Sequence, residues 1–270
     1  DLHRRRHSFP TRRSSDLQGI NILLNMFFGP FVNAARGIAV QVQGAVTQFS
    51  TNFQTALNPQ ITKSYALGDF TYMHSLIFRS SKFTFLLLAV ISFPILLETE
   101  MILQLWLNMV PAYTVVFVRL MLCITIIDAM GGAFMVAAQS TGRVRFYQSV
   151  VGGILLAIVP VSYVVLRLGA APWSVFLIHF CVCTVAFFVR LFIIRSMIHL
   201  SLYSYFHAVL LRCLYVLLLA MPLPIGLLYI FPATLWAGIS VCFVSVLTIS
   251  LSSYRVGLAE GERKFIKEKI

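Results

Sequence analysis

The sequence predicts an all-α, polytopic transmembrane helical bundle. Hydrophobic residues make up 59% of the 270 residues, charged residues make up 11%, and the mean hydropathy is +0.87. A soluble domain of this composition would expose more apolar surface than water tolerates. Several apolar stretches also reach the roughly 20 helical residues that cross a bilayer core of about 30 Å. These stretches are Leu76–Leu97, Tyr113–Ala138, Phe146–Leu168, Trp173–Ile194, Val209–Tyr229 and Leu235–Ser253.

The chain divides into four segments. Residues 1–17, DLHRRRHSFPTRRSSDL, resemble translated sequencing adapter, and we expect them to be non-native; a genuine basic tail or the start of a signal peptide is the alternative. Residues 18–30 form a partial transmembrane helix, because Ile20–Phe28 is only about half a crossing. Residues 31–253 form a transmembrane lobe of about seven spans, and residues 254–270 form a tail on the membrane surface.

Basic residues fall in every second connection between the spans. The basic connections carry Lys63, Arg79 and Lys82; then Arg143 and Arg145; then Arg190, Arg195 and Arg212; and finally Arg255, Arg263, Lys264, Lys267 and Lys269. The connections between them carry Glu98 and Glu100, then the single Arg167, then no charge. By the positive-inside rule the basic side and the C-terminus face the cytoplasm. Without residues 1–17, which hold five arginines and two aspartates, the net charge falls from +12 to +9. This charge fits loops that face anionic lipid headgroups, and we expect no nucleic-acid partner.

Motifs for enzymes and cofactors are not found in the sequence. It contains no phosphate-binding loop, nucleotide fingerprint, paired-histidine zinc helix or Gly-x-Ser-x-Gly turn. Cys181 and Cys183 point about 200° apart on a helix and cannot share a metal ion. We therefore expect no enzymatic activity, no cofactor and no metal site.

The stretch Phe31–Asn58 is the most polar of the predicted spans. On a helix its main polar stripe covers about 60°, with Asn33 beside it. The stripe consists of Arg36, Gln43, Thr47, Ser50 and Gln54. Polar groups that face lipid stay unsatisfied, so the stripe faces partner helices or a water-filled cavity. Arg36 offers a planar fork suited to phosphate, although an arginine that reaches the membrane interface is the alternative. A second group, Gln41, Gln48 and Asn52, is typical of hydrogen bonds between helices.

Two ionisable residues occur in the stretch Tyr113–Ala138. Arg119 and Asp128 lie about 13.5 Å apart along the helix axis and on opposite sides, so they cannot pair with each other. Arg119 is near the predicted outer end of its span. Asp128 is deep and precedes Gly131–Gly132, a weak point in the helix. Three interpretations of Asp128 stay open: it takes up a proton, it pairs with a cation on another helix, or burial keeps it protonated.

Four ordered blocks of the sequence resemble a known family. They are NILLNMFFGPFVNAARGIAVQVQGAVTQFSTNFQTALNPQITKSYALGD (Asn21–Asp69), SKFTFLLLAVISFPILLETE (Ser81–Glu100), QSTGRVRFYQ (Gln139–Gln148) and GLAEGERKFIKEKI (Gly257–Ile270). Together they are similar to the second half of bacterial polysaccharide-export flippases of the O-antigen type. These flippases belong to the multidrug/oligosaccharidyl-lipid/polysaccharide exporter superfamily.

The resemblance implies a MATE-like fold of two helical lobes around a central cavity, of which this chain is the C-terminal lobe. Such a protein moves undecaprenyl-pyrophosphate-linked oligosaccharides across the bacterial inner membrane, and cations in its cavity attract the pyrophosphate. We expect the cavity to be lined by Asn33, Arg36, Gln43, Thr47, Ser50 and Gln54, with Arg119 as a weaker candidate and Asp128 for proton or ion coupling. The N-terminal lobe is not in this sequence, so we expect the chain alone to be inactive.

Two other functions remain as alternatives. A cation-coupled multidrug exporter of the same superfamily would use acidic cavity residues, but Asp128 is the only deep carboxylate, so an anionic substrate fits better. An integral-membrane polysaccharide enzyme would need a catalytic base with polar partners or a large external loop. The short external connections, which carry few charges, argue against such an enzyme.

Overall fold

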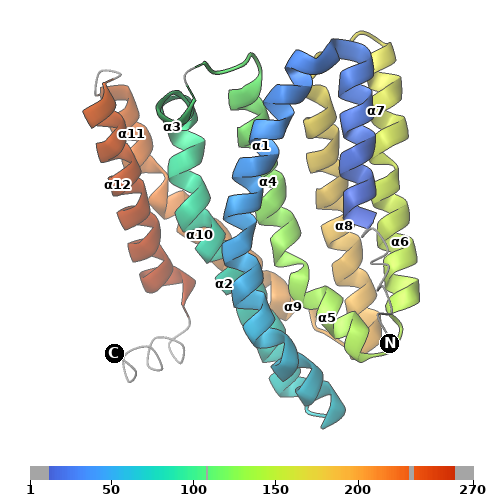
Figure 1. Ribbon diagram of the computed structural model, residues 1–270. Helices are drawn as coiled ribbons and strands as arrows, with labels where there is room; N and C mark the ends of the chain where they lie inside the picture. Colours follow the sequence, from blue (N-terminus) through green and yellow to red (C-terminus); the bar gives the residue numbers. More distant parts are fainter. Residues whose placement is uncertain (1–11, 108, 231–233, 259–270) are drawn as a thin grey trace, which may run out of the picture.

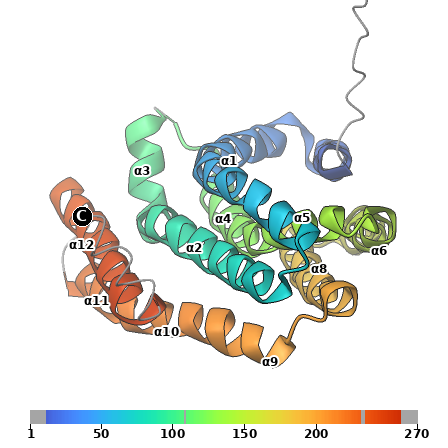
Figure 2. The same ribbon diagram turned by 90° about the horizontal axis from the view of Figure 1, so that it is seen from below.

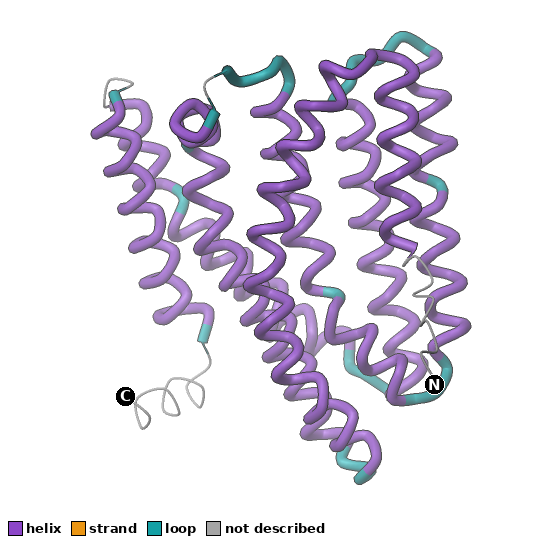
Figure 3. Tube along the Cα trace, viewed as in Figure 1, coloured by secondary structure: helices purple, strands orange, loops and turns teal. Residues whose placement is uncertain are grey.

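A computed structural model describes residues 12–107, 109–230 and 234–258. These residues are helical apart from short connections, and they contain no strand (Figure 3). Among the described residues, seven helical segments are long and apolar enough to cross a membrane: Gln18–Ala66, Phe70–Leu97, Thr114–Ser140, Val144–Arg167, Ser174–Ile198, Leu202–Ile230 and Leu235–Gly257. The predicted all-α polytopic bundle is therefore confirmed.

Several of these segments consist of more than one helix. Along the chain the helices are α1 (Arg12–Ala66), α2 (Phe70–Leu97), α3 (Thr99–Trp106), α4 (Thr114–Met130), α5 (Gly132–Ser140), α6 (Val144–Leu156), α7 (Ile158–Arg167), α8 (Ser174–Ile198), α9 (Leu202–Tyr205), α10 (Leu211–Ala220), α11 (Pro222–Ile230) and α12 (Leu235–Ser252), with two π-helical turns, η1 (Phe206–Leu210) and η2 (Ser253–Gly257).

Helix α1 consists of two halves that meet at Gly29. The backbone of Gly29 has φ 76° and ψ −173°, a conformation that favours glycine, and Pro30 then begins the second half. The first half lies beside α7, and the second half descends through the middle of the bundle (Figure 1). We expected this second half to end near Asn58, but it continues through Pro59 to Ala66. Packing explains the extension, because Ile61 and Ser64 in the added turns are buried.

Helix α2 occupies the centre of the bundle. It contacts α1 and α4 on one side and α12 on the other. The last two spans, α9–α11 and α12, attach to the remaining helices mainly through α2 (Figure 2). Two clusters of buried side chains stabilise the bundle, one around Phe117 and Phe176 and the other around Phe134 and Tyr205.

The two ends of the bundle differ in composition. The basic end comprises the connections after α1, α5 and α8 and the turn η2 after α12, and its exposed side chains include Lys63, Arg143, Arg145, Arg195 and Arg255. The opposite end, here the tryptophan end, carries Trp106, Trp173 and Trp236. Helix α3 lies across the tryptophan end, since it is viewed end-on in Figure 1 and lengthwise in Figure 2. The ends therefore have the chemistry of two different membrane interfaces.

Candidate functional site

A cavity of about 670 Å³ lies among α1, α4, α5, α6 and α8. We call it the central polar cavity. Its lining residues are Thr47, Ser50, Thr51, Gln54, Thr125, Asp128, Ala129, Gly131, Gly132, Met135, Tyr147, Gln148, Val151, Gly152, Leu155 and Arg190. Along α1 the cavity lies between the two hydrophobic clusters. The α1 residues that line it follow Val46, which belongs to one cluster, and precede Ile61, which belongs to the other.

An ion pair forms part of the cavity wall. The Arg190 guanidinium on α8 donates to the Asp128 carboxylate on α4, with 2.8 Å between Nη1 and Oδ1. At about 1.5 Å per residue, Asp128 lies about 21 Å and Arg190 about 24 Å from the starts of their helices at the tryptophan end. Both residues therefore lie well inside helices of membrane-crossing length, and in a bilayer an ionised side chain at such a position requires a partner. Of the three interpretations of Asp128, the structure shows pairing with a cation on another helix.

Arg190 is the site residue that sequence reasoning missed. We grouped it with Arg195 and Arg212 as part of a basic connection, yet it lies inside α8, eight residues before the helix ends at Ile198. The available signal was its position within the predicted span Trp173–Ile194. Its side chain is 13% exposed, so it is largely enclosed by the bundle.

The polar stripe of α1 faces the interior, as predicted for its middle part. Gln43 is buried and donates to the Thr125 hydroxyl at 2.9 Å. Thr47, Ser50 and Gln54 line the central polar cavity, where Gln54 Nε2 donates to the Ala129 carbonyl at 2.8 Å. The structure thus places these three stripe residues in one cavity with Asp128.

Arg36 and Asn33 lie outside the lining of this cavity. Arg36 Nη1 donates to the Asn21 side-chain oxygen at 3.4 Å, across the turn at Gly29. Arg36 is about 27 Å along the helix axis from Gln54, although both face the same side. The side-chain oxygen of Asn33 is buried and accepts no hydrogen bond from the described residues. Both residues therefore belong to the tryptophan end of α1.

Arg119 lines a second cavity, of about 550 Å³, at the tryptophan end. Its Nε donates to the Thr99 hydroxyl at 3.2 Å, and Glu98 and Glu100 also line this space. Arg119 and Asp128 are on different cavities, which agrees with their predicted separation along α4.

The second polar group of α1 faces away from the other helices. Gln41, Gln48 and Asn52 are exposed, and Gln48 Nε2 donates to the Asn52 side-chain oxygen at 3.0 Å. Thr55 on the same helix is exposed as well. We call Gln41, Gln48, Asn52 and Thr55 the outer polar face of α1. Such a face at membrane depth is incompatible with lipid, so it meets water or other protein.

Metal chemistry has no support in the described part of the chain, where no three His, Cys, Asp or Glu residues gather closely enough to hold an ion. Comparisons with known proteins give no further assignment, because no protein-family model, curated protein or solved structure matches the chain.

Proposed function

We propose that this chain is one lobe of a bacterial inner-membrane flippase that carries undecaprenyl-pyrophosphate-linked oligosaccharides. The observation that carries the proposal is the central polar cavity, which holds Arg190 among hydroxyl and amide side chains at membrane depth. A transporter for an amphiphile with a charged headgroup needs such a polar compartment inside an apolar bundle. The resemblance of Asn21–Asp69 and the other three blocks to O-antigen flippases supports the same assignment.

Arg190 favours an anionic substrate. A guanidinium presents two parallel N–H donors, which match the oxygens of a phosphate group. Asp128 balances the charge of Arg190 in the ion pair. Arg36, nearer the tryptophan end of the same stripe, supplies a second cation along the route that a phosphate would follow.

A second helical lobe is the proposed partner of this chain. The outer polar face of α1 requires a covering that provides hydrogen bonds, and a second lobe with a water-filled space between the lobes meets that requirement. We propose that an N-terminal lobe of the same protein supplies it. The chain alone is then inactive in transport, because one lobe cannot enclose the substrate.

The proposed orientation places the basic end in the cytoplasm. Exposed Lys and Arg side chains gather there, as the positive-inside rule requires. The Asp128–Arg190 pair lies nearer to this end than to the tryptophan end of its helices. The cavity is thus placed to receive a headgroup from the cytoplasmic leaflet.

Complementation tests this function. The gene that encodes this chain together with the proposed N-terminal lobe is expressed in a bacterium that lacks its own O-antigen flippase, and surface polysaccharide is measured. We expect wild type to restore polysaccharide and Arg190→Gln to abolish it at matched membrane abundance. Arg145→Gln, an exposed residue at the basic end, is the matched control and should retain export. If Arg190→Gln still restores surface polysaccharide, Arg190 does not bind the substrate. If Arg36→Ala then abolishes surface polysaccharide, Arg36 is the cation that binds the phosphate.

The multidrug exporter remains the second candidate because a carboxylate, Asp128, lines the cavity. This candidate predicts that the same gene protects cells against cationic dyes and that Asp128→Asn abolishes the protection. No change in dye resistance with the wild-type gene would exclude it.

A further inference from the structure

The span Thr114–Ser140 is interrupted at Gly131. Helix α4 ends at Met130, α5 begins at Gly132, and the backbone of Gly131 has φ −79° and ψ −4°. In a continuous α-helix the Phe134 N–H would donate to the Met130 carbonyl. Here it donates to the Gly131 carbonyl, at 3.2 Å. The regular ladder of backbone hydrogen bonds is therefore broken at one turn.

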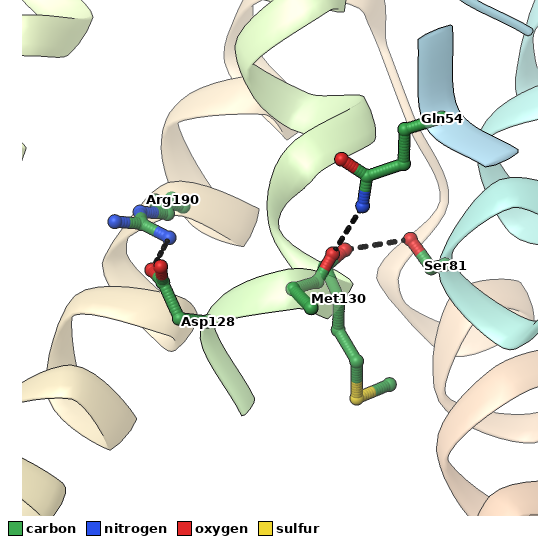
Figure 4. A network of polar contacts seen from close by, with 6 residues as sticks. Gln54, Ser81, Asp128, Met130 and Arg190 are labelled. Carbon is green, nitrogen blue, oxygen red and sulfur yellow. Dashed lines mark hydrogen bonds and ion pairs between the residues drawn. The ribbon is translucent and has the colours of Figure 1, made fainter. Parts of the chain in front are cut away.

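Side chains from two neighbouring helices bond to the carbonyls at this break. Ser81 on α2 donates to the Met130 carbonyl at 2.9 Å, and Gln54 on α1 donates to the Ala129 carbonyl at 2.8 Å (Figure 4). Inside a membrane, backbone carbonyls released from a helix must find such partners, because no bulk water is present. The Asp128–Arg190 pair adds a connection to α8 one turn before α5 begins (Figure 4). Three helices thus hold the same turn of the α4–α5 span.

The two glycines leave room for these side chains. A Cβ atom at Gly131 would lie 2.8 Å from Arg190 Nη1, and a Cβ atom at Gly132 would overlap the Gln54 amide. Glycine also gives the backbone the greatest conformational freedom, and glycine-containing turns are where helices bend. The same two residues therefore bring the side chains close to the backbone and make the span deformable.

We propose that Gly131–Gly132 is a hinge in the α4–α5 span. The side chains of Gln54 and Ser81 and the Asp128–Arg190 pair hold this hinge in the observed conformation. An anion in the central polar cavity releases it by taking Arg190 from Asp128. This inference rests on the anionic substrate of the proposed function and adds its coupling to a movement. Helix α5 and the following α6 supply Met135, Tyr147 and Gln148 to the cavity wall. Bending at the hinge therefore changes the shape of the cavity.

The exchange of partners follows from the geometry of the pair. Asp128 is 23% exposed and lines the cavity, so a phosphate group that enters the cavity competes directly for the Arg190 donors. A ligand shifts a conformational equilibrium only by its difference in affinity for the two states. Because the coupling is reciprocal, a substitution that releases the hinge also strengthens binding of the anion.

Whether these side chains hold the hinge is tested without any ligand by amide hydrogen exchange of the 270-residue chain in lipid nanodiscs. Ser81→Ala and Asp128→Asn should raise the exchange rates of the amides at residues 131–135 by about fivefold to tenfold, the factor expected for one lost buried hydrogen bond. Ser92→Ala is the matched control, because Ser92 is a buried serine on the same helix α2 that donates no hydrogen bond to the hinge. Unchanged exchange in both Ser81→Ala and Asp128→Asn would show that these side chains do not hold the hinge.

The release step is tested with inorganic pyrophosphate. We expect pyrophosphate to raise exchange at residues 131–135 in wild type, to bind more tightly to Asp128→Asn, and to have no effect on Arg190→Gln. Binding to wild type without any change in exchange, or weaker binding to Asp128→Asn, would overturn release by anion exchange. Hydrogen exchange and pyrophosphate binding are measured without transport. If complementation fails but these two measurements agree with the hinge, the hinge stands and only the assignment of a lipid-linked oligosaccharide as substrate is wrong.

Discussion

The Arg190 guanidinium on α8 and the Asp128 carboxylate on α4 lie 2.8 Å apart within a bundle of membrane-length helices. The pair connects two helices far apart in sequence, and it borders the same turn at which the α4–α5 span is interrupted. The pair has two roles. Each charge offsets the cost of enclosing the other in an apolar bundle, and the pair fixes the turn at Gly131–Gly132.

Removing both partners of this pair should destabilise the fold by less than the sum of the two single removals. A single substitution leaves one charge enclosed by the bundle, whereas the double substitution removes both charges. We expect Asp128→Asn and Arg190→Gln each to lower the free energy of unfolding by about 1–3 kcal/mol, below the range for fully buried pairs because both side chains are partly exposed. The double variant should recover about 1–2 kcal/mol relative to the sum. Reversible unfolding in mixed detergent micelles measures this cycle, and strictly additive effects would show that the pair contributes no coupling.

Gly132→Ala should destabilise the protein, although alanine is the better helix former. Alanine in place of glycine stabilises a helix interior by about 1 kcal/mol. At Gly132 the added Cβ overlaps the Gln54 amide, and a forced contact of this kind costs about 1–3 kcal/mol. Gly153→Ala on α6 is the matched control, because a Cβ there meets nothing within 4 Å and should stabilise. Adding Gln54→Ala should rescue Gly132→Ala in the same unfolding measurement, and no rescue would mean that Gln54 is not the obstacle.

The sequence predicts the spans and the middle of the polar stripe because both depend on local patterns. Length and hydropathy alone predict membrane-crossing helices, and a 100° rotation per residue places Gln43, Thr47 and Gln54 on one face. The angular position of a residue around the helix does not tell how far along the helix it lies. Arg36 therefore shares the face of Gln54 but lies about 27 Å from it along the helix axis. The helix break was predictable from Gly131–Gly132. The partner of Asp128 was not, because the meeting of α4 and α8 depends on tertiary packing.

The tryptophan end should lie at the level of the lipid headgroups. All three tryptophans of the chain, Trp106, Trp173 and Trp236, lie at this end, and Trp236 is 80% exposed. Tryptophan favours the interface because its ring is apolar and its N–H is polar. In vesicles of brominated phospholipids we expect bromines near the headgroup to quench tryptophan fluorescence more than bromines near the acyl-chain ends. Stronger quenching by the deep bromines would place this end inside the hydrocarbon.

The C-terminus should lie in the cytoplasm if the basic end faces inward. A fluorescent protein fused after Ile270 should then fluoresce, whereas alkaline phosphatase fused at the same position should be inactive. The control fusion is placed in the connection that contains Pro111, between α3 and α4 at the tryptophan end, and its phosphatase should be active. Active phosphatase after Ile270 would invert the proposed orientation and would place the cavity nearer the outer leaflet.

The outer polar face of α1 should be in contact with water. Thiols react as thiolates, which form readily in water and poorly in hydrocarbon, so the rate of modification by a charged thiol reagent reports hydration. Gln48→Cys is compared with Phe192→Cys in a variant whose five native cysteines are replaced. Both positions are exposed. Gln48 lies about 27 Å from Pro30, where the second half of α1 begins, and Phe192 lies about 27 Å from Ser174, where α8 begins at the tryptophan end. In bilayers Gln48→Cys should react at least about tenfold faster, since amide and hydroxyl groups retain water and Phe192 faces lipid. Equal rates would mean that lipid covers both faces, and the argument for a second lobe on this face would fail.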